Sequence, residues 1–264
     1  MEDVTLDDIF ISIKTSEKFH QTRIVHIMKT WFNLAKKQTY IFTDGDDVQL
    51  NHTANGHLVN THCGTGRGYS NLGCKMGTEY DTFLSTGKKW WCRFDDDNYV
   101  NPTRLLEVIK GFNWTSDIYV GRLSVDYLHT DYQGKTYCYQ FAQGGAGCCI
   151  SRPLALKMKP WCGREALVNT QNQAAMSDDC ALGFIITALL KVDIILSDFF
   201  HSDYENLTSI NPNTFYKQVS LGWSNTNKID LNNGSQSKVF NEEQDPSRFY
   251  SLHCMLYPST DFCK

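Results

Sequence analysis

Three consecutive aspartates, Asp95, Asp96 and Asp97, carry the strongest chemical signal in the chain. They follow Trp90–Phe94, an apolar segment typical of a buried strand. Open α/β sheets bind ligands outside the carboxyl ends of their strands, which is where these carboxylates would lie. Three adjacent negative charges held there need a cation, and oxygen ligands suit Mg²⁺ or Mn²⁺, which keep other coordination positions for water and phosphates. In this context the triplet predicts a metal–diphosphate site, whereas in a solvated loop it would mean little.

A second pair of carboxylates lies at the start of a predicted helix. Asp178 and Asp179 follow Ser177, and a helix cap is one interpretation of their position. The alternative is a general base directed at an acceptor hydroxyl. His201 follows another predicted strand. A lone histidine is usually structural, but imidazole is also a common ligand in Mn²⁺-class sites.

Two glycine-rich segments could lie close to a ligand. Glycines in Gln143-Gly-Gly-Ala-Gly147 would let the backbone approach a ligand, but a tight turn after a strand is the simpler interpretation. The segment is not a P-loop, because no Lys-Ser/Thr follows, and it lacks the G-x-G-x-x-G spacing. Cys63-Gly-Thr-Gly-Arg-Gly68 is interpreted as a loop bounded by a disulfide rather than as a phosphate-binding loop.

The elements that must position these residues alternate between strands and helices through the first two thirds of the chain. This alternation predicts an α/β fold with a mostly parallel sheet covered by helices on both faces. The last third has scattered short strands and many turns, and no linker or repeat divides the chain. We therefore expect one domain over residues 1–264 with an irregular C-terminal portion. The predicted strands are Ile9–Ile13, Thr39–Thr43, His57–Val59, Trp90–Phe94, Asp117–Val120, Tyr137–Phe141 and Val192–Leu196, and the predicted helices are Ile24–Ala35, Leu72–Leu84, Thr103–Lys110 and Ser177–Leu190.

Composition excludes several classes of protein. The chain has 264 residues, of which 41% are hydrophobic and 20% charged, as in an ordinary globular protein. Its net charge of −4 gives no electrostatic basis for binding nucleic acid or an anionic membrane. The longest apolar stretch, Ala181–Leu190, is too short to span a bilayer and predicts a buried helix. No secretory signal is visible at the N-terminus.

Ten cysteines indicate an oxidising compartment. The paired C-x-x-C knuckles of a zinc site do not occur, and 63/74 and 254/263 form two pairs at short spacing. The alternative is a set of buried free thiols in a cytosolic enzyme. If the chain is lumenal, its targeting segment would lie upstream. Weak support for secretion comes from N-x-S/T sequons at Asn51, Asn113, Asn206 and Asn233.

Six segments, in order along nearly the whole chain, carry a resemblance to a known family. They are Gln38–Asp44, Trp91–Pro102, Phe141–Gly147, Asp178–Gly183, Phe200–Ser202 and Asp245–Cys254, followed by Leu256–Pro258 and Cys263. The Asp triplet and the Gly-Gly-Ala-Gly turn resemble β1,3-glycosyltransferases in general. The C-terminal segment resembles those of the Fringe type specifically, and the similarity extends from Ile9 to Cys263.

The resemblance implies a GT-A fold and an inverting transfer of N-acetylglucosamine. The donor would be UDP-GlcNAc, and the acceptor would be the 3-hydroxyl of O-linked fucose on EGF-like repeats, notably of Notch receptors. The family works in the Golgi as type II membrane proteins with Mn²⁺, so this chain would be the lumenal catalytic part, with its membrane anchor upstream. The nucleotide sugar is expected on residues 8–120, and the acceptor and the base on residues 121–264.

The resemblance also implies roles on the donor side of the site. Asp97 corresponds to the family's Mn²⁺ ligand, and Asp95 and Asp96 would lie against the nucleotide sugar. Arg23 and Asp44 match positions that contact the nucleotide.

On the acceptor side, Asp179 matches the catalytic base, which leaves Asp178 as a helix cap whose change to Asn should be the milder one. His201 matches the His of a Phe-His-Ser segment and is the expected second metal ligand. Fringe enzymes usually have another His two residues later, where Asp203 stands here. Asp203 would have to substitute if that second His were the ligand.

Three disulfides are implied by the resemblance, namely Cys63–Cys74, Cys92–Cys149 and Cys254–Cys263. The pairing of Cys138, Cys148, Cys162 and Cys180 stays open.

Two other functions are compatible with these residues. A β1,3-galactosyltransferase would keep the fold and the donor type but change the sugars. A non-catalytic secreted lectin would use Asp95–Asp97 to hold Ca²⁺, which also binds carboxylates. A lectin would bind glycan without consuming a UDP-sugar, so release of UDP distinguishes a glycosyltransferase from a lectin.

Overall fold

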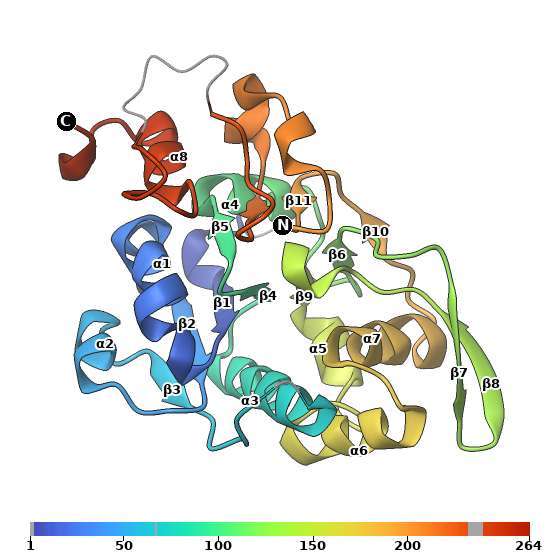
Figure 1. Cartoon of the computed structure of the whole chain (residues 1–264). Coiled ribbons are helices and arrows are strands. Elements are labelled where there is room, and N and C mark those ends of the chain that lie inside the picture. Colours follow the sequence, from blue (N-terminus) through green and yellow to red (C-terminus); the bar gives the residue numbers. More distant parts are fainter. Residues whose placement is uncertain (1–2, 67, 232–239) are drawn as a thin grey trace.

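The computed structural model describes residues 3–66, 68–231 and 240–264, so the sequon at Asn233 lies outside the described residues. A seven-stranded sheet forms the centre, in the order β10-β6-β9-β4-β1-β2-β3 (Figure 1). Neighbouring strands are parallel except β9, which is antiparallel to β4 and β6. The predicted mostly parallel α/β sheet is confirmed. Its strands are β1 (Ile9–Lys14), β2 (Thr39–Thr43), β3 (Leu58–Asn60), β4 (Trp90–Asp95), β6 (Tyr119–Gly121), β9 (Cys148–Ser151) and β10 (Ile195–Leu196).

The two central strands, β1 and β4, determine where the site forms. The first five residues of each are buried, as expected of parallel strands covered on both faces. Alternate side chains of β1 enter separate apolar cores, with Ile11 on one face and Phe10 on the other. The register sets Lys14 opposite Asp95, so the carboxyl ends of both strands meet at one edge of the sheet.

Helices cover both faces of this sheet (Figure 1). Buried side chains of α1, α2, α4 and α8 belong to one core, and those of α3, α5, α6 and α7 belong to the other. The helices are α1 (Val25–Lys29), α2 (Val48–Thr53), α3 (Tyr69–Thr86), α4 (Pro102–Lys110), α5 (Arg152–Lys157), α6 (Arg164–Ala174), α7 (Asp178–Gly183) and α8 (Phe249–Leu256).

The predicted helices are present, with two local differences. The helix predicted over 24–35 is divided into a π-helical turn (His20–Ile24), α1 and a 3₁₀ turn (Trp31–Leu34). Leu34 is consequently 37% exposed instead of lying in the core. The apolar helix starting at Asp178 continues beyond α7 as a π-helical segment, Phe184–Leu189.

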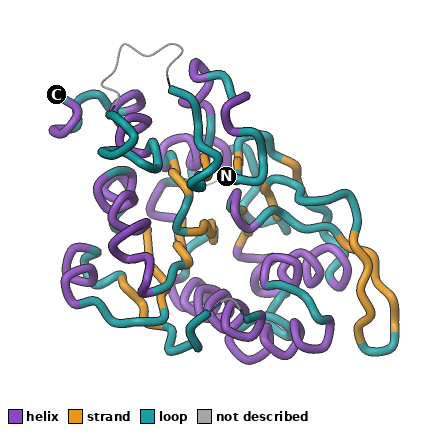
Figure 2. The backbone as a smooth tube through the Cα atoms, in the orientation of Figure 1, coloured by secondary structure: helices purple, strands orange, loops and turns teal. Residues whose placement is uncertain are grey.

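The strand predicted over 137–141 is present as a strand but lies outside the central sheet, and β9 is among the short strands that were not predicted. The strand over 137–141 belongs to a separate hairpin of β7 (Leu128–Tyr132) and β8 (Lys135–Tyr139), which lies at the edge of the molecule (Figure 2). Strand β9 was not predicted, because its four residues directly follow the glycine turn and are too few to show a period. β9 nevertheless joins β4 to β6 and completes the sheet.

The C-terminal portion is irregular, as predicted. A small sheet of β11 (Phe200–His201), β12 (Ser220–Gly222) and β5 (Asn98–Val100) ties it to the segment directly after the Asp triplet. The three expected disulfides, Cys63–Cys74, Cys92–Cys149 and Cys254–Cys263, are all present. Among the residues described, no helix has the length and apolar character needed to cross a bilayer.

Candidate active site

A pocket of about 370 Å³ lies at the carboxyl ends of β1 and β4. Its lining includes the whole triplet Asp95–Asp97, Asp178 and Asp179 from the first turn of α7, and Gly144 and Gly145 from the glycine turn. These segments are up to 84 residues apart in the sequence, from Asp95 to Asp179. The sheet therefore brings the three strongest sequence signals into one cavity.

Two neighbours hold the triplet in place. The Thr15 hydroxyl, just after β1, donates to Asp96 at 2.6 Å. Arg23 Nη1 donates to Asp96 at 2.7 Å and to Asp97 at 3.0 Å, and its guanidinium stacks over the Phe19 ring at 4.2 Å. Arg23, expected at the nucleotide, thus lines the pocket in contact with the triplet.

The electrostatics of the triplet favour a bound cation. Burial raises the pKa of Asp97 well above its ordinary value, and the Asp95 and Asp96 carboxylates add to this effect. Burial also raises the pKa of Asp96, although Arg23 opposes it. A divalent cation would favour the ionised forms, because metal ligands must be deprotonated.

The donor set fits a cation that is held mainly by its substrate. Within the described residues, no group of three or more His, Cys, Asp or Glu side chains is gathered as a complete metal site. Magnesium-class ions are commonly bound through one or two carboxylates and complete their coordination with water and phosphate oxygens. Asp203 lines the same pocket, and its charge contributes to the raised pKa of Asp97. Asp97 and Asp203 are therefore two carboxylates suited to such an ion.

His201 is not brought together with the triplet. It lies in β11, is 7% exposed and is absent from the pocket lining. Its Nδ1 lies 3.1 Å from Glu205 Oε2 and its Nε2 lies 3.0 Å from Gln218 Oε1, so both ring nitrogens have protein partners. From this segment, Asp203 and Tyr204 line the pocket, and Asp203 is the one with a carboxylate.

Asp44 does not line the pocket but contacts a residue that does. Its carboxylate is 2.7 Å from Lys75 Nζ and accepts the Glu17 N–H at 2.8 Å. Burial acts to raise the pKa of Asp44, but the bonds from Lys75 and Glu17 lower it overall. Lys75 also donates to the Thr15 carbonyl at 2.9 Å and does line the pocket. Asp44 thus orients Lys75 and the loop after β1.

Asp179 faces the glycine turn with one oxygen held. Its Oδ1 accepts the Ser177 hydroxyl at 2.5 Å and the Cys180 N–H at 2.9 Å. A Cβ on Gly144 would lie 3.2 Å from Oδ2, so this glycine leaves space beside the carboxylate. Gly147 has φ +84°, and a Cβ there would lie 2.2 Å from the Phe94 ring, so the turn requires glycine.

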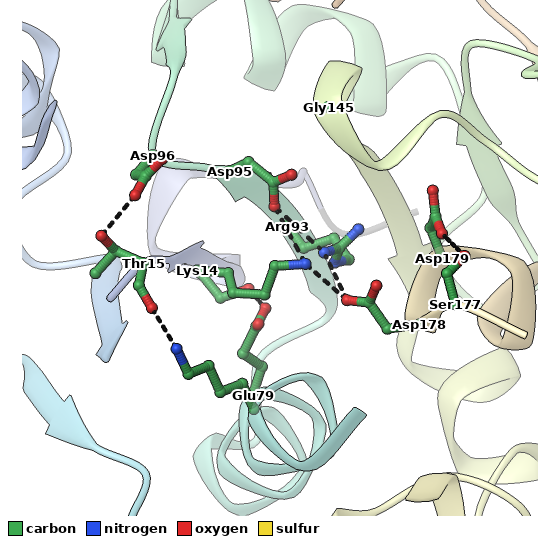
Figure 3. Close-up of polar contacts among 12 residues, drawn as sticks. Lys14, Thr15, Glu79, Arg93, Asp95, Asp96, Gly145, Ser177, Asp178 and Asp179 are labelled. Atoms are coloured by element: carbon green, nitrogen blue, oxygen red, sulfur yellow. Dashed lines mark hydrogen bonds and ion pairs between the residues drawn. The ribbon is translucent and has the colours of Figure 1, made fainter. Parts of the chain in front are cut away.

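Asp178 is not the helix cap that the sequence suggested. Ser177 occupies the N-cap position, and the Asp178 side chain is only 6% exposed. Its carboxylate is 2.6 Å from Lys14 Nζ and 3.9 Å from Arg93 Nη2 (Figure 3). Burial alone would raise the pKa of Asp178, but Lys14 and Arg93 lower it. That Asp178→Asn is milder than Asp179→Asn in turnover stays a prediction, but the change weakens a buried ion pair, and breaking such a pair costs about 3–5 kcal/mol of stability.

Sequence reasoning overlooked the segment that follows β1. This segment could have been found by the argument that located the triplet, since it also follows a central strand of a parallel sheet. The lining residues from the C-terminal portion have no such local signal. The overlooked lining residues include Lys14 at the end of β1, Thr15, Ser16, Lys18 and Phe19 after β1, Lys75 on α3, and Tyr204 and Ser224.

Fold and site together define a class of protein. Counted along the chain, the sheet strands lie in the order 3-2-1-4-6-5-7 with the sixth antiparallel, and carboxylates stand at the carboxyl edge of the central strands. This is the arrangement of a GT-A glycosyltransferase domain. A family model described as Fringe-like matches residues 4–260, and the chain belongs to the Fringe family.

Relatives of known name agree with this assignment. The lunatic fringe β-1,3-N-acetylglucosaminyltransferase of Danio rerio is 42% identical over 269 residues, which cover 99% of this chain and 71% of the relative. The radical fringe enzyme of Gallus gallus is 43% identical, covering 99% of this chain and 72% of the relative. The Fringe glycosyltransferase of Drosophila melanogaster is 43% identical, with 98% and 64% covered. The chain is therefore a glycosyltransferase.

Proposed function

We propose that this chain transfers N-acetylglucosamine from UDP-GlcNAc to the 3-hydroxyl of O-linked fucose on EGF-like repeats, including those of Notch-type receptors. It would work in the Golgi lumen, with a membrane anchor upstream. Identities of 42% and 43% to relatives named β-1,3-N-acetylglucosaminyltransferases support the sugar and the linkage. The observation that carries the proposal is that Asp97 and Asp179 line one pocket, because the reaction needs a leaving-group site and a base around one carbon.

The donor would bind the part of the pocket built from residues 8–120. Asp95 and Asp96 would lie against the sugar, and the cationic side chains of Arg23 and Lys75 favour binding of the diphosphate. Asp44 would act indirectly, through Lys75. Mn²⁺, when bound at Asp97, supplies positive charge that stabilises the UDP leaving group.

Asp203 is the better candidate than His201 for the second metal ligand. Asp203 lines the pocket beside Asp97, whereas both nitrogens of His201 are bonded to Glu205 and Gln218. A carboxylate is also a harder ligand than imidazole and suits Mn²⁺ as well as Mg²⁺.

Asp179, in the acceptor part formed by residues 121–264, would act as the base. In an inverting transfer, the fucose O3 bonds to the anomeric carbon from the face opposite the phosphate. The bond from that carbon to the phosphate oxygen breaks, and UDP leaves with the electron pair. Because Oδ1 of Asp179 is held by Ser177 and Cys180, its Oδ2 would accept the hydroxyl proton.

The test is an assay with UDP-GlcNAc and a fucosylated EGF repeat, with and without Mn²⁺. Asp179→Asn should bind UDP nearly normally and lose roughly 10²–10⁴-fold in turnover, since it cannot accept the proton. Asp97→Ala should abolish transfer while the protein stays folded. Asp198→Asn, on a fully exposed side chain, is the matched control and should leave turnover unchanged. An active Asp179→Asn enzyme would refute the base assignment.

The same assay separates the alternatives. A β1,3-galactosyltransferase would prefer UDP-galactose when UDP-sugars are tested against fucosyl and GalNAc acceptors. A Ca²⁺-dependent lectin would bind glycan but release no UDP from any donor.

A further inference from the structure

One lysine joins the two halves of the candidate site. Lys14, the last residue of β1, places its Nζ 2.6 Å from Asp178 on α7 and 3.4 Å from Asp95 at the end of β4. Figure 3 shows the ammonium between these two carboxylates. The contact to Asp178 spans 164 residues of sequence and connects the donor-side strand to the helix that carries Asp179.

Lys14 and Asp178 depend on each other because both are buried. Their side chains are 13% and 6% exposed. The next cation near Asp178 is Arg93, whose Nη2 is 3.9 Å away and which is shared with Asp95 at 3.6 Å. Without Lys14, the Asp178 carboxylate would keep only this distant partner, and a buried unpaired carboxylate is strongly unfavourable. The start of α7 would then shift to re-solvate the charge.

A shift of that turn would be transmitted to Asp179. The two aspartates are adjacent, and Oδ1 of Asp179 is bonded to Ser177 and Cys180 within the same turn. Asp179 therefore has no anchor of its own outside this turn among the hydrogen bonds of the described residues. A misplacement of about 1 Å at a reacting group can lower the rate by about 10²-fold.

We propose that Lys14 is a positioning residue that holds Asp178, and through it the base-bearing turn of α7, against the donor side of the site. This inference rests on the proposed function, because it assumes that Asp179 is the base. It predicts a specific kinetic signature. Loss of Lys14 should lower kcat while leaving nucleotide binding nearly intact, whereas a lysine that simply bound the donor phosphates would do the reverse.

The experiment compares Lys14→Met, Lys14→Arg and Glu79→Gln in the purified chain. Steady-state kinetics give kcat and KM, and calorimetric titration with UDP in Mn²⁺ gives Kd. We expect Lys14→Met to lose on the order of 10²-fold in kcat, with Kd for UDP changed less than about threefold. Lys14→Arg, which keeps a cation able to reach Asp178, should recover most of kcat.

Glu79→Gln is the matched control within the same buried cluster. Glu79 accepts the Ser12 hydroxyl at 2.6 Å and lies outside the pocket lining, so the amide keeps this bond and changes only the charge near Lys14 and Arg93. Its kcat should stay within about threefold of the wild type, since the Lys14–Asp178 pair is intact. If Glu79→Gln lost as much kcat as Lys14→Met, the cluster would act through overall charge, and the proposal would be overturned.

Other outcomes also decide the question. A rise of more than about tenfold in Kd for UDP with kcat unchanged would make Lys14 a donor-binding residue and overturn the proposal. If Lys14→Met does not fold, Lys14→Gln, which also removes the charge, is measured in its place and judged by the same kcat and Kd criteria. Asp179→Asn is measured in parallel. If that variant is active, the base assignment fails. If it is inactive while Lys14→Met keeps its kcat, only the inference about Lys14 fails.

Discussion

The Arg23 guanidinium lies 3.0 Å from the carboxylate of Asp97, the residue that is proposed to hold the metal. The same Nη1 is 2.7 Å from Asp96, so one arginine is shared between two of the three aspartates. A cation arriving at Asp97 must therefore share or displace this arginine. Arg23 and the metal are in competition until a diphosphate provides negative charge for both.

Replacing Arg23 should consequently have opposite effects on two ligands. Arg23→Gln should tighten Mn²⁺ binding in the absence of nucleotide by on the order of tenfold, because it removes a competing charge about 3 Å from the ligand oxygen. The same variant should bind UDP more weakly in the presence of Mn²⁺. Electron paramagnetic resonance of free Mn²⁺ and calorimetry with UDP measure the two constants. Unchanged or weaker Mn²⁺ binding without nucleotide would contradict the competition.

Substitution of Asp203 should weaken metal binding, whereas substitution of His201 should lower stability. Asp203→Ala removes a carboxylate that lines the pocket, so Mn²⁺ affinity should fall about tenfold or more with little change in Tm. His201→Ala breaks the bonds to Glu205 and Gln218 in a buried setting, so Tm should fall while the folded protein keeps its Mn²⁺ affinity. The opposite pattern would restore His201 as the ligand.

The Cys254–Cys263 disulfide should stabilise a segment with little regular structure. It closes a loop of sequence separation 9 between α8 and the chain end. Peptide mapping under non-reducing conditions should recover the two cysteines joined. Cys254→Ser with Cys263→Ser should lose about 2–3 kcal/mol in the free energy of unfolding, measured by denaturant titration. Recovery of both as free alkylated thiols would contradict this pairing.

Stability should depend on pH through a buried histidine. Burial lowers the pKa of His253 from its ordinary 6.5 to about 4, and its Nδ1 lies 2.8 Å from the Tyr99 hydroxyl. The unfolded chain therefore binds this proton at higher pH than the folded protein does. The contribution of His253 to the free energy of unfolding is complete above pH 6.5, and it falls by about 3 kcal/mol as the pH drops to 4.

Glu79 changes the free energy of unfolding with pH in the opposite direction to His253, so the experiment must remove its effect. Burial raises the pKa of Glu79 from 4.5 to about 7. Its contribution to the free energy of unfolding is therefore complete below pH 4.5 and is lost as the pH rises to 7. Denaturant unfolding between pH 7.5 and 4.5 should be compared for Glu79→Gln and for Glu79→Gln with His253→Asn. The first protein should lose stability as pH falls, and the second should lose clearly less. Equal slopes would show that His253 does not couple folding to protons.

Local sequence was sufficient to predict the central parallel strands and the position of the triplet. The short apolar runs at β1, β2 and β4 are almost entirely buried, as expected of strands in a sheet that is covered on both faces. A parallel sheet then directs the residues after each strand to one edge, which predicts where Asp95–Asp97 lie. Spacing suggested the pairs 63/74 and 254/263, but the Cys92–Cys149 disulfide and the individual roles of Asp97 and Asp179 were expected only because the segments resemble a family.

Only the tertiary structure revealed which partners these residues have. Asp178 looked like a helix cap in sequence, yet it pairs with Lys14 across 164 residues, and nothing in local spacing encodes that contact. His201 looked like a ligand, yet the packing of β11 directs its ring to Glu205 and Gln218. The physical reason is that backbone periodicity depends on near neighbours, whereas a buried charge is matched by whichever opposite charge the fold brings within about 4 Å.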